Sequence, residues 1–408
     1  MSIFESRPLA RWAVPVAAAA IAVGAVAWPS EAKADLPDRS AEQLLVDVQQ
    51  AKVDGLSGTL SETADLGLPA LPAGFGGSTG TSLQSLVTGT HTARVWISGE
   101  HLSRIAVQAD AQETNIVRNN TDVWQWSSAD RTVTHVVLPT EAQGKAAAQK
   151  HEAAAKAKHP TTKTDAAASM PATPQEAAQK IVSELSKTST VTTADTATVA
   201  GRPVYELVLT PKDATTRVSN VRIAIDGETH VPTRVQVFST KMATPAVELG
   251  FTSITFSAPD ASVFAFAPAK DVTVKTTDLT KTQADHPASA EPAQKLEEPT
   301  LVTDQNVVGT GWGEIAVGKA DLKAMAKLQQ ADKVAAGQTN KVPAEERSNA
   351  AGQTDPNELL KLLPETTGTW GTGRVLDGTL VSAVITTDGR YAIGAVAPEA
   401  LYKALPAK

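Results

Sequence analysis

Short runs in which apolar and polar residues alternate occupy most of the chain, and this period of two is typical of β-strands. Neighbouring runs are separated by few turn residues, so we expect antiparallel neighbours, because a parallel pair needs a long crossover. The predicted strands, about eleven, lie at residues 56–64, 88–97, 101–109, 112–118, 122–127, 132–138, 191–199, 203–210, 217–226, 231–240 and 246–257. A large open sheet usually curls, which favours an incomplete antiparallel β-barrel.

Two helices are predicted beside these strands. The first begins at Ser40, and Gln43 three residues later completes a capping-box pattern. The second begins at Thr173, with Pro174 at its first position. Their apolar positions include Leu44, Leu45, Val48, Ile181 and Leu185. A curled sheet with these helices as lids forms a hydrophobic container, so the expected fold is α+β and mainly β.

Composition divides the chain into two units. Residues 35–274 form the predicted half-barrel domain, interrupted at 141–172 by a segment that has almost no large apolar residue and is expected to be disordered. Residues 275–300 are polar, charged and contain prolines, as in a linker. Residues 301–408 are predicted to be a small C-terminal α+β domain with strands at 307–317, 372–376, 380–386 and 390–396 and a helix near Pro398.

The N-terminus has the features of a secretory signal peptide. Arg7 and Arg11 precede an uncharged run at 12–28, and the small residues Ala32 and Ala34 follow. This order predicts cleavage after Ala34, so that residues 1–34 are removed and the rest is exported and extracytoplasmic. The alternative is an uncleaved N-terminal membrane anchor, although the apolar run is at the short limit for a span.

Charge and cysteine content exclude several classes of function. The formal net charge is −7, which provides no basic surface for nucleic acid. The chain has no cysteine, so thiolate catalysis and cysteine zinc sites are ruled out. No cofactor motif is present either: the glycines at 309–313 lack the spacing and the following helix of a dinucleotide-binding turn.

No catalytic or metal-binding motif lies in a context that suits its chemistry, which also favours a non-enzymatic protein. Ser78 lies in a G-x-S-x-G pattern, but in a glycine-rich loop, so a hydrolase is a weak alternative. His151 and His159 are placed eight residues apart in a low-complexity tract, which favours a solvated segment over a metal site. The strand histidines His91, His101 and His135 could meet in space.

Large apolar residues on the strands are the better candidates for a site. Trp124 and Trp126 share a face of one strand, and Trp96 shares a face with Arg94 on another. Phe251 and Phe256 are placed on opposite faces of the last long strand by the same alternation. The proposed cavity lining is Trp96, Trp124, Trp126, Tyr205, Leu207, Phe251 and Phe256. An ordinary core is the competing interpretation, and Arg94 could bind a lid helix or a ligand carbonyl.

Several stretches of the first domain resemble LolA-like lipoprotein carriers. The similarity is carried by residues 205–211, 221–226, 231–238, 251–260 and 264–268, and by the order helix, strands, helix, strands over residues 40–274. The resemblance implies an incomplete eleven-strand barrel closed by helices, with a cavity that carries acyl chains. The insertion at 141–172 departs from that pattern.

The C-terminal part resembles the second domain of MucB/RseB-type regulators at residues 307–312, 376–382 and 394–398. That resemblance implies binding of a membrane-anchored anti-sigma factor and sensing of envelope signals. Two functions are therefore expected: a carrier that holds lipid or lipoprotein acyl chains, with the two helices gating the cavity, and, as the alternative, a regulator that binds a membrane-anchored partner.

Overall fold

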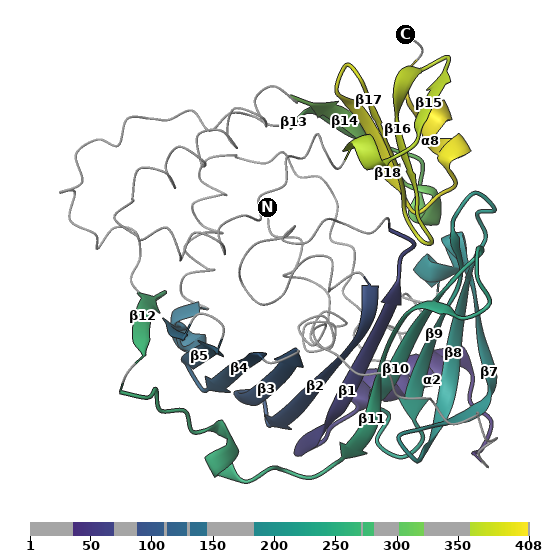
Figure 1. Ribbon diagram of the computed structural model, residues 1–408. Helices are drawn as coiled ribbons and strands as arrows, with labels where there is room; N and C mark the ends of the chain where they lie inside the picture. Colours follow the sequence, from purple (N-terminus) through teal and green to yellow (C-terminus); the bar gives the residue numbers. More distant parts are fainter. Residues whose placement is uncertain are drawn as a thin grey trace, which may run out of the picture.

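The computed structural model describes residues 36–68, 88–109, 112–128, 131–144, 183–270, 272–280, 302–321 and 360–406. The fold is mainly β, with a large open sheet of twelve strands and a second sheet of six strands (Figure 1). The large sheet does not close into a barrel. The predicted fold class, a β-rich incomplete barrel followed by a smaller domain, is therefore confirmed.

The strands of the large sheet run in the order β12-β6-β5-β4-β3-β2-β1-β11-β10-β9-β8-β7. Their bounds are β1 Gly55–Asp65, β2 Thr88–Ser98, β3 Leu102–Ala109, β4 Gln112–Asn119, β5 Asp122–Ser127, β6 Thr132–Val137, β7 Ser189–Val199, β8 Arg202–Pro211, β9 Val218–Asp226, β10 Pro232–Ser239, β11 Pro245–Thr255 and β12 Thr273–Asp278. Eleven of them match the predicted runs. Because β1 pairs with both β2 and β11, the two halves of the chain form one sheet.

The twelfth strand was not predicted from the alternating pattern. After β11 the chain forms a short 3-10 helix, η1 (Ala261–Phe264), and returns along the sheet to β12, which pairs in parallel with β6 (Figure 1). Residues 275–278 were predicted as the start of a linker because they are polar. All but the last residue of β12 are exposed. The strand is therefore held in place by its hydrogen bonds to β6 and not by burial of its side chains.

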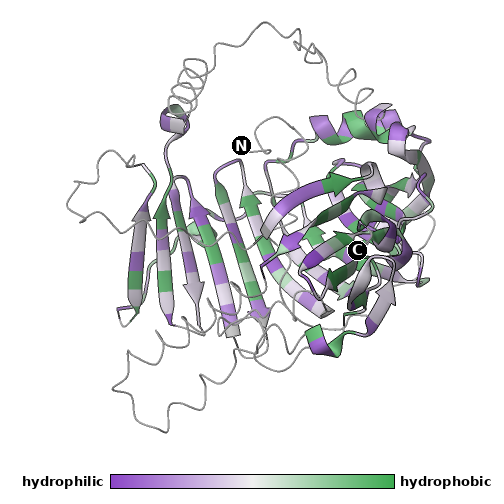
Figure 2. Ribbon diagram, turned by 90° about the horizontal axis from the view of Figure 1, so that it is seen from above, coloured by the Kyte–Doolittle hydropathy of each residue, from purple (hydrophilic) through white to green (hydrophobic). Residues whose placement is uncertain are grey.

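The two faces of the large sheet differ in what packs on them. We call the face that carries Tyr205 and Leu207 the helix face, because α2 (Ala41–Gln50) packs against it. The opposite face carries Trp96, Trp124 and Trp126 and is called the tryptophan face. Figure 2 shows apolar and polar residues alternating along the strands. Successive side chains of a strand point to opposite faces, so this alternation gives the two faces different residues.

The first predicted helix is present as α2 and has the expected cap. The Ser40 side chain accepts a hydrogen bond from the backbone N–H of Gln43, and the Gln43 side chain accepts one from the backbone N–H of Ser40. Its predicted apolar stripe is buried at Leu44, Leu45 and Val48. Of the second helix, residues 183–188 are described as helical, and Leu185 packs partly buried against the same cluster.

The smaller sheet has the strand order β13-β14-β18-β17-β16-β15. Its elements are β13 Val302–Val308, β14 Ile315–Ala320, β15 Glu365–Gly368, β16 Gly371–Asp377, β17 Ser382–Thr386, β18 Arg390–Gly394 and the helix α8 Pro398–Ala404. The single strand predicted at 307–317 is wrong. Gly309 and Gly311 adopt positive φ angles, and the chain turns there through the 3-10 helix η3 (Gly311–Gly313) into a hairpin of β13 and β14.

The two sheets pack against each other through an apolar cluster. Val218 and Ala246 of the large sheet are buried against Leu380, which lies between β16 and β17. Backbone groups also pair across the joint: Thr216 forms a β-bridge with Val396, and the Thr379 N–H donates to the carbonyl oxygen of Leu66. The small sheet thus lies over one end of the large sheet as a docked domain (Figure 1).

An ion cluster borders this joint. The carboxylate of Asp377 lies 2.7 Å from the Arg217 guanidinium and 2.7 Å from the Lys241 ammonium. Arg217 directly precedes β9 and Lys241 follows β10 in the chain. Partial burial alone would raise the pKa of Asp377, but Lys241 and Arg217 outweigh this effect and hold that pKa below its ordinary value. The deprotonated form of Asp377 therefore stabilises the docked arrangement.

Some predictions fall outside the described residues. These are the signal peptide at 1–34 with its cleavage after Ala34, the lid position Ile181, Ser78, His151, His159, and the insertion from residue 145 to 172. Among the residues that are described, no helix is long and apolar enough to cross a membrane.

Replacing Asp377 with Asn should lower the free energy of unfolding at pH 7 by roughly 0.2–1 kcal/mol, the usual contribution of a partly exposed ion pair. Because the folded-state pKa is depressed, the stabilisation is present above the ordinary aspartate pKa and is lost as the pH falls through the folded-state value. The difference between variant and wild type should therefore shrink below about pH 4. Asp54→Asn, an exposed site away from the joint, is the control; an equal loss in both variants would rule out the ion cluster.

Candidate ligand-binding site

The seven predicted lining residues are divided between the two faces of the large sheet. Cross-strand pairs place Trp96 opposite Arg104, Arg104 opposite Val117, and Val117 opposite Trp124, all on the tryptophan face. Tyr205 and Leu207 lie on the helix face. One cavity on one face therefore does not contain all seven residues, because side chains on opposite faces of a sheet cannot line the same hollow.

Trp124 packs against other parts of its own chain. Its ring stacks on His135 at a centroid distance of 3.7 Å, and Phe266 lies against it at 5.5 Å. The return segment, residues 261–278, is also tied to this face, since the carbonyl oxygen of Val263 accepts a hydrogen bond from Arg104. The return segment thus contributes to a small core on the tryptophan face, which the sequence pattern had assigned to a ligand cavity.

On the helix face, Tyr205 and Leu207 are already covered by α2. Leu207 is 2% exposed and Leu44 of α2 is fully buried against the same cluster. The cluster also includes Ile225, opposite Tyr205 on β9. Burial of these side chains stabilises the docked helix, at about 1.5–3 kcal/mol for each large aliphatic side chain. A ligand could reach this part of the face only if α2 moved.

Phe251 and Phe256 contact the same apolar cluster, so the predicted opposite placement is wrong. The register between β1 and β11 shifts by one residue between Thr59 and Leu60, as in a β-bulge. Phe251 pairs with Leu60 on the helix face, and Phe256 lies just beyond the end of β11 against the cluster of Leu56 and Leu60. A bulge of this kind leaves the alternating sequence pattern unchanged, which is why alternation gave the wrong face.

The helix face continues beyond this cluster as an apolar surface on β2 to β6. Val95 pairs with Ile105, Ile105 with Ile116, and Val123 with Val136. The side chains of Ile105, Ile116, Val123 and Val136 are only half-buried. We call these residues, together with Ile97, the acyl surface. The cavity lining predicted from the sequence was mainly aromatic and did not include them, although the period-two patterns of β2 to β6 contain them.

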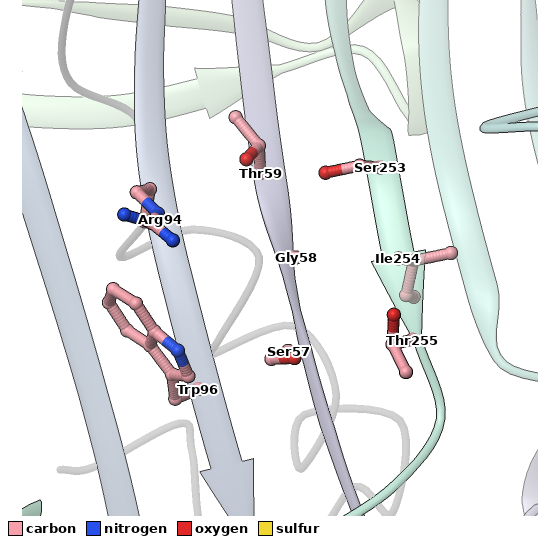
Figure 3. Close-up of a pocket in the computed structure, with 8 residues that line it drawn as sticks. All are labelled: Ser57, Gly58, Thr59, Arg94, Trp96, Ser253, Ile254 and Thr255. Atoms are coloured by element: carbon pink, nitrogen blue, oxygen red, sulfur yellow. The ribbon is translucent and has the colours of Figure 1, made fainter. Parts of the chain in front are cut away.

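A small groove lies on the opposite, tryptophan face (Figure 3). It has a volume of about 150 Å³ and crosses β2, β1 and β11. Its lining residues are Ser57, Gly58, Thr59, Arg94, Trp96, Ser253, Ile254 and Thr255. The lining is mostly polar, so the groove does not suit an acyl chain. Arg94 is exposed here and lies on the face opposite α2, so of its possible roles contact with that helix does not occur.

The three strand histidines do not meet. His91 is buried and its Nδ1 lies 3.0 Å from Glu62 on the helix face. His135 contacts Asp122 at 2.7 Å on the tryptophan face, and His101 lies near Arg118. Each histidine thus has its own local partner. Among the described residues, no group of three or more His, Asp or Glu side chains could hold a metal ion.

Buried charges stabilise the second half of the sheet. Asp226 is fully buried and accepts hydrogen bonds from Arg202 and Thr229. Burial would raise the pKa of Asp226, but these hydrogen bonds outweigh it and hold that pKa below its ordinary value. Glu206 is also buried and lies 2.7 Å from Arg234. The Asp226 pair lies at strand ends and the Glu206 pair lies within the strands, and neither pair lines the groove of Figure 3.

Similar known proteins are found among solved structures and not by sequence. No protein-family model and no curated protein matches the sequence. Among solved structures, the chain is similar to a chain of the Pseudomonas aeruginosa MucA/MucB complex, with a TM-score of 0.38 and 12% identity over 90% of this chain and 97% of that chain. It is also similar to a LolA superfamily protein from Nitrosomonas europaea, with a TM-score of 0.20 and 9% identity over 56% of this chain and 99% of that chain.

A third likeness is to the Mycobacterium tuberculosis lipoprotein LppX, with a TM-score of 0.24 and 10% identity over 51% of this chain and 92% of that chain. The matched structures thus include a LolA superfamily protein and MucB, the two groups that the sequence resembles. All three TM-scores are below 0.5 and all three identities are below 25%.

Replacing Gly58 with Val should destabilise the helix face. A side chain at this position would meet the carbonyl oxygen of Ser253 and come within 2.9 Å of the Phe251 ring. Overpacking of this kind costs about 1–3 kcal/mol, measurable by denaturant unfolding. At Gly144 an added side chain would meet no atom within 4 Å, so Gly144→Ala should change stability by less than about 0.5 kcal/mol. Equal stability of the two variants would contradict the close approach of Phe251.

Proposed function

We propose that this protein is an extracytoplasmic carrier that binds the acyl chains of a lipid or lipoprotein on the helix face of its large sheet. The observation that carries the proposal is the acyl surface, which extends the buried cluster of Leu56, Leu60 and Phe251 across β2 to β6. Its aliphatic side chains are half-buried. A contiguous surface of this kind can bury a hydrocarbon chain without specific polar partners.

The energetics of chain burial fit such a surface. Each methylene group transferred from water contributes about 0.8 kcal/mol, so a long acyl chain is held by the sum of many weak contacts. The rows from Val95 to Ile116 and from Val123 to Val136 run across the strands, and neighbouring strands are about 4.8 Å apart. An extended chain placed along such a row could contact several strands at once.

The helix α2 has the place of a lid in this proposal. It rests on the same face as the acyl surface, but over β8 and β9, where Leu44, Leu45 and Val48 are buried. Its apolar contacts replace those that a ligand would make. Displacement of α2, together with the predicted second helix that contains Leu185, would therefore extend the apolar surface toward β8.

The test is binding of a fluorescent long-chain fatty acid to the full chain, with Ile105→Asp as the decisive variant. A carboxylate on the acyl surface would be desolvated by the ligand, so affinity should fall at least about tenfold. The matched control is Ala106→Asp, which places the same charge one residue along β3 on the tryptophan face. Affinity should change less than about twofold there.

The result is interpretable only for folded protein, so the thermal midpoints of both variants are measured in parallel. Absence of fatty-acid binding by the wild type, or equal losses in Ile105→Asp and Ala106→Asp, would refute the carrier proposal.

The exposed edge strand of the small sheet supports a second candidate, a regulator that binds an extended segment of a membrane-anchored partner. In β13 the side chains of Val307 and Val308 are 58% and 40% exposed. Within the described residues β13 pairs with a strand on one side only. An exposed apolar edge of this type is where a partner can add a strand to a sheet.

A photo-crosslinking residue at position 307 tests the second candidate in membranes of the source cell. We expect it to capture a membrane protein that the same residue at position 362 does not capture, because Leu362 is 51% exposed but does not belong to the edge strand. The extracytoplasmic segment of that protein, made as a peptide, should bind the wild type and not Val307→Lys. Capture from both positions, or a peptide that binds both proteins equally, would exclude the edge strand as a partner site.

A further inference from the structure

The groove on the tryptophan face contains groups that donate hydrogen bonds and no acidic group. Arg94 and Trp96 come from β2, Ser57 and Thr59 from β1, and Ser253 and Thr255 from β11 (Figure 3). The strand register explains the arrangement: Thr59 lies between Arg94 and Ser253, and Ser57 lies between Trp96 and Thr255. Four hydroxyl groups, a guanidinium and an indole thus line one open space.

The positive charge in this groove is held without a carboxylate partner. The Arg94 guanidinium lies 5.0 Å from the centroid of the Trp96 ring, and the Arg104 guanidinium lies 5.7 Å from it. Arg104 bonds to the neutral oxygens of Asn115 and Val263. No ion pair found among the described residues includes Arg94. A contact with an aromatic ring positions a guanidinium and leaves its N–H groups free to donate.

We infer that this groove binds a phosphate group. A phosphate has several oxygen acceptors and a negative charge, which match the fork of Arg94 and the surrounding hydroxyl donors. The chain as a whole has a net charge of −7, so the positive charge that attracts a phosphate must be local, as it is at Arg94. The volume of about 150 Å³ leaves room for a small group attached to the phosphate, such as the glycerol part of a lipid headgroup.

This site is independent of the proposed acyl surface. It lies on the opposite face of the large sheet, so one lipid molecule cannot fill both sites. Gly58 borders both faces, since its backbone lines the groove and its missing side chain leaves space for Phe251. Loss of one binding activity is therefore not expected to remove the other.

Calorimetric titration of the full chain at low salt with glycerol 3-phosphate, inorganic phosphate and glycerol tests the inference. We expect glycerol 3-phosphate to bind and neutral glycerol not to bind. Tighter binding of glycerol 3-phosphate than of inorganic phosphate would identify a headgroup site, and equal binding would identify a free phosphate site. Absence of binding by both phosphate compounds would overturn the inference.

Two substitutions localise the site. Arg94→Gln should weaken glycerol 3-phosphate binding by about tenfold or more, because a charge-assisted hydrogen bond is lost. Lys275→Gln removes the same charge from the exposed strand β12 and should leave affinity unchanged. Equal effects of the two substitutions would show attraction by net charge alone and would reject the groove. Ile105→Asp should retain phosphate binding, which separates failure of this site from failure of the acyl surface.

Discussion

The hydrogen-bond register of β1 with its two neighbours is the constraint on which both candidate surfaces depend. β1 joins β2, its neighbour in sequence, to β11, which is almost two hundred residues away along the chain. This central pairing turns two antiparallel strand series into one sheet. It also sets which side chains share a face, since a shift of one residue would exchange the two faces. The bulge opposite Thr59 and Leu60 is where that register changes.

The two faces of the sheet have different chemistry because different segments cover them. On the helix face, α2 buries aliphatic side chains of β8 and β9, while the strands β2 to β6 present half-buried aliphatic residues. On the tryptophan face, the return segment packs against β3 to β5 and leaves the groove beside Trp96 open. Hydrocarbon binding and anion binding require opposite environments, and a sheet can provide both on its two sides.

Docking of the small sheet limits the movement of the large one. Thr216, Arg217 and Ser239 bond to the small sheet through backbone or side-chain groups, and Val218 is buried in the joint. These residues lie at the ends of β9 and β10, and β9 is one of the two strands covered by α2. A partner that bound the exposed edge at β13 could therefore alter the large sheet through this joint. The joint thus connects the sheet that carries the acyl surface with the sheet that carries the edge strand β13.

Local sequence determined the secondary structure of this protein to a large extent. The period-two pattern placed eleven strands of the large sheet, and the Ser40 and Gln43 pair placed the start of α2, because alternation and capping depend on residues close in sequence. The glycines at 309 and 311 were read as part of a strand, although their positive φ angles make a turn.

Tertiary structure alone decided which side chains share a surface. The face of Phe256 depended on a bulge between strands far apart in sequence, and Trp124 was covered by a segment that returns from residue 261. The groove around Arg94 needs three strands, one of which is distant along the chain, in one register. Pairing between distant strands is set by the packing and hydrogen bonding of the whole sheet, and no local pattern of residues specifies it.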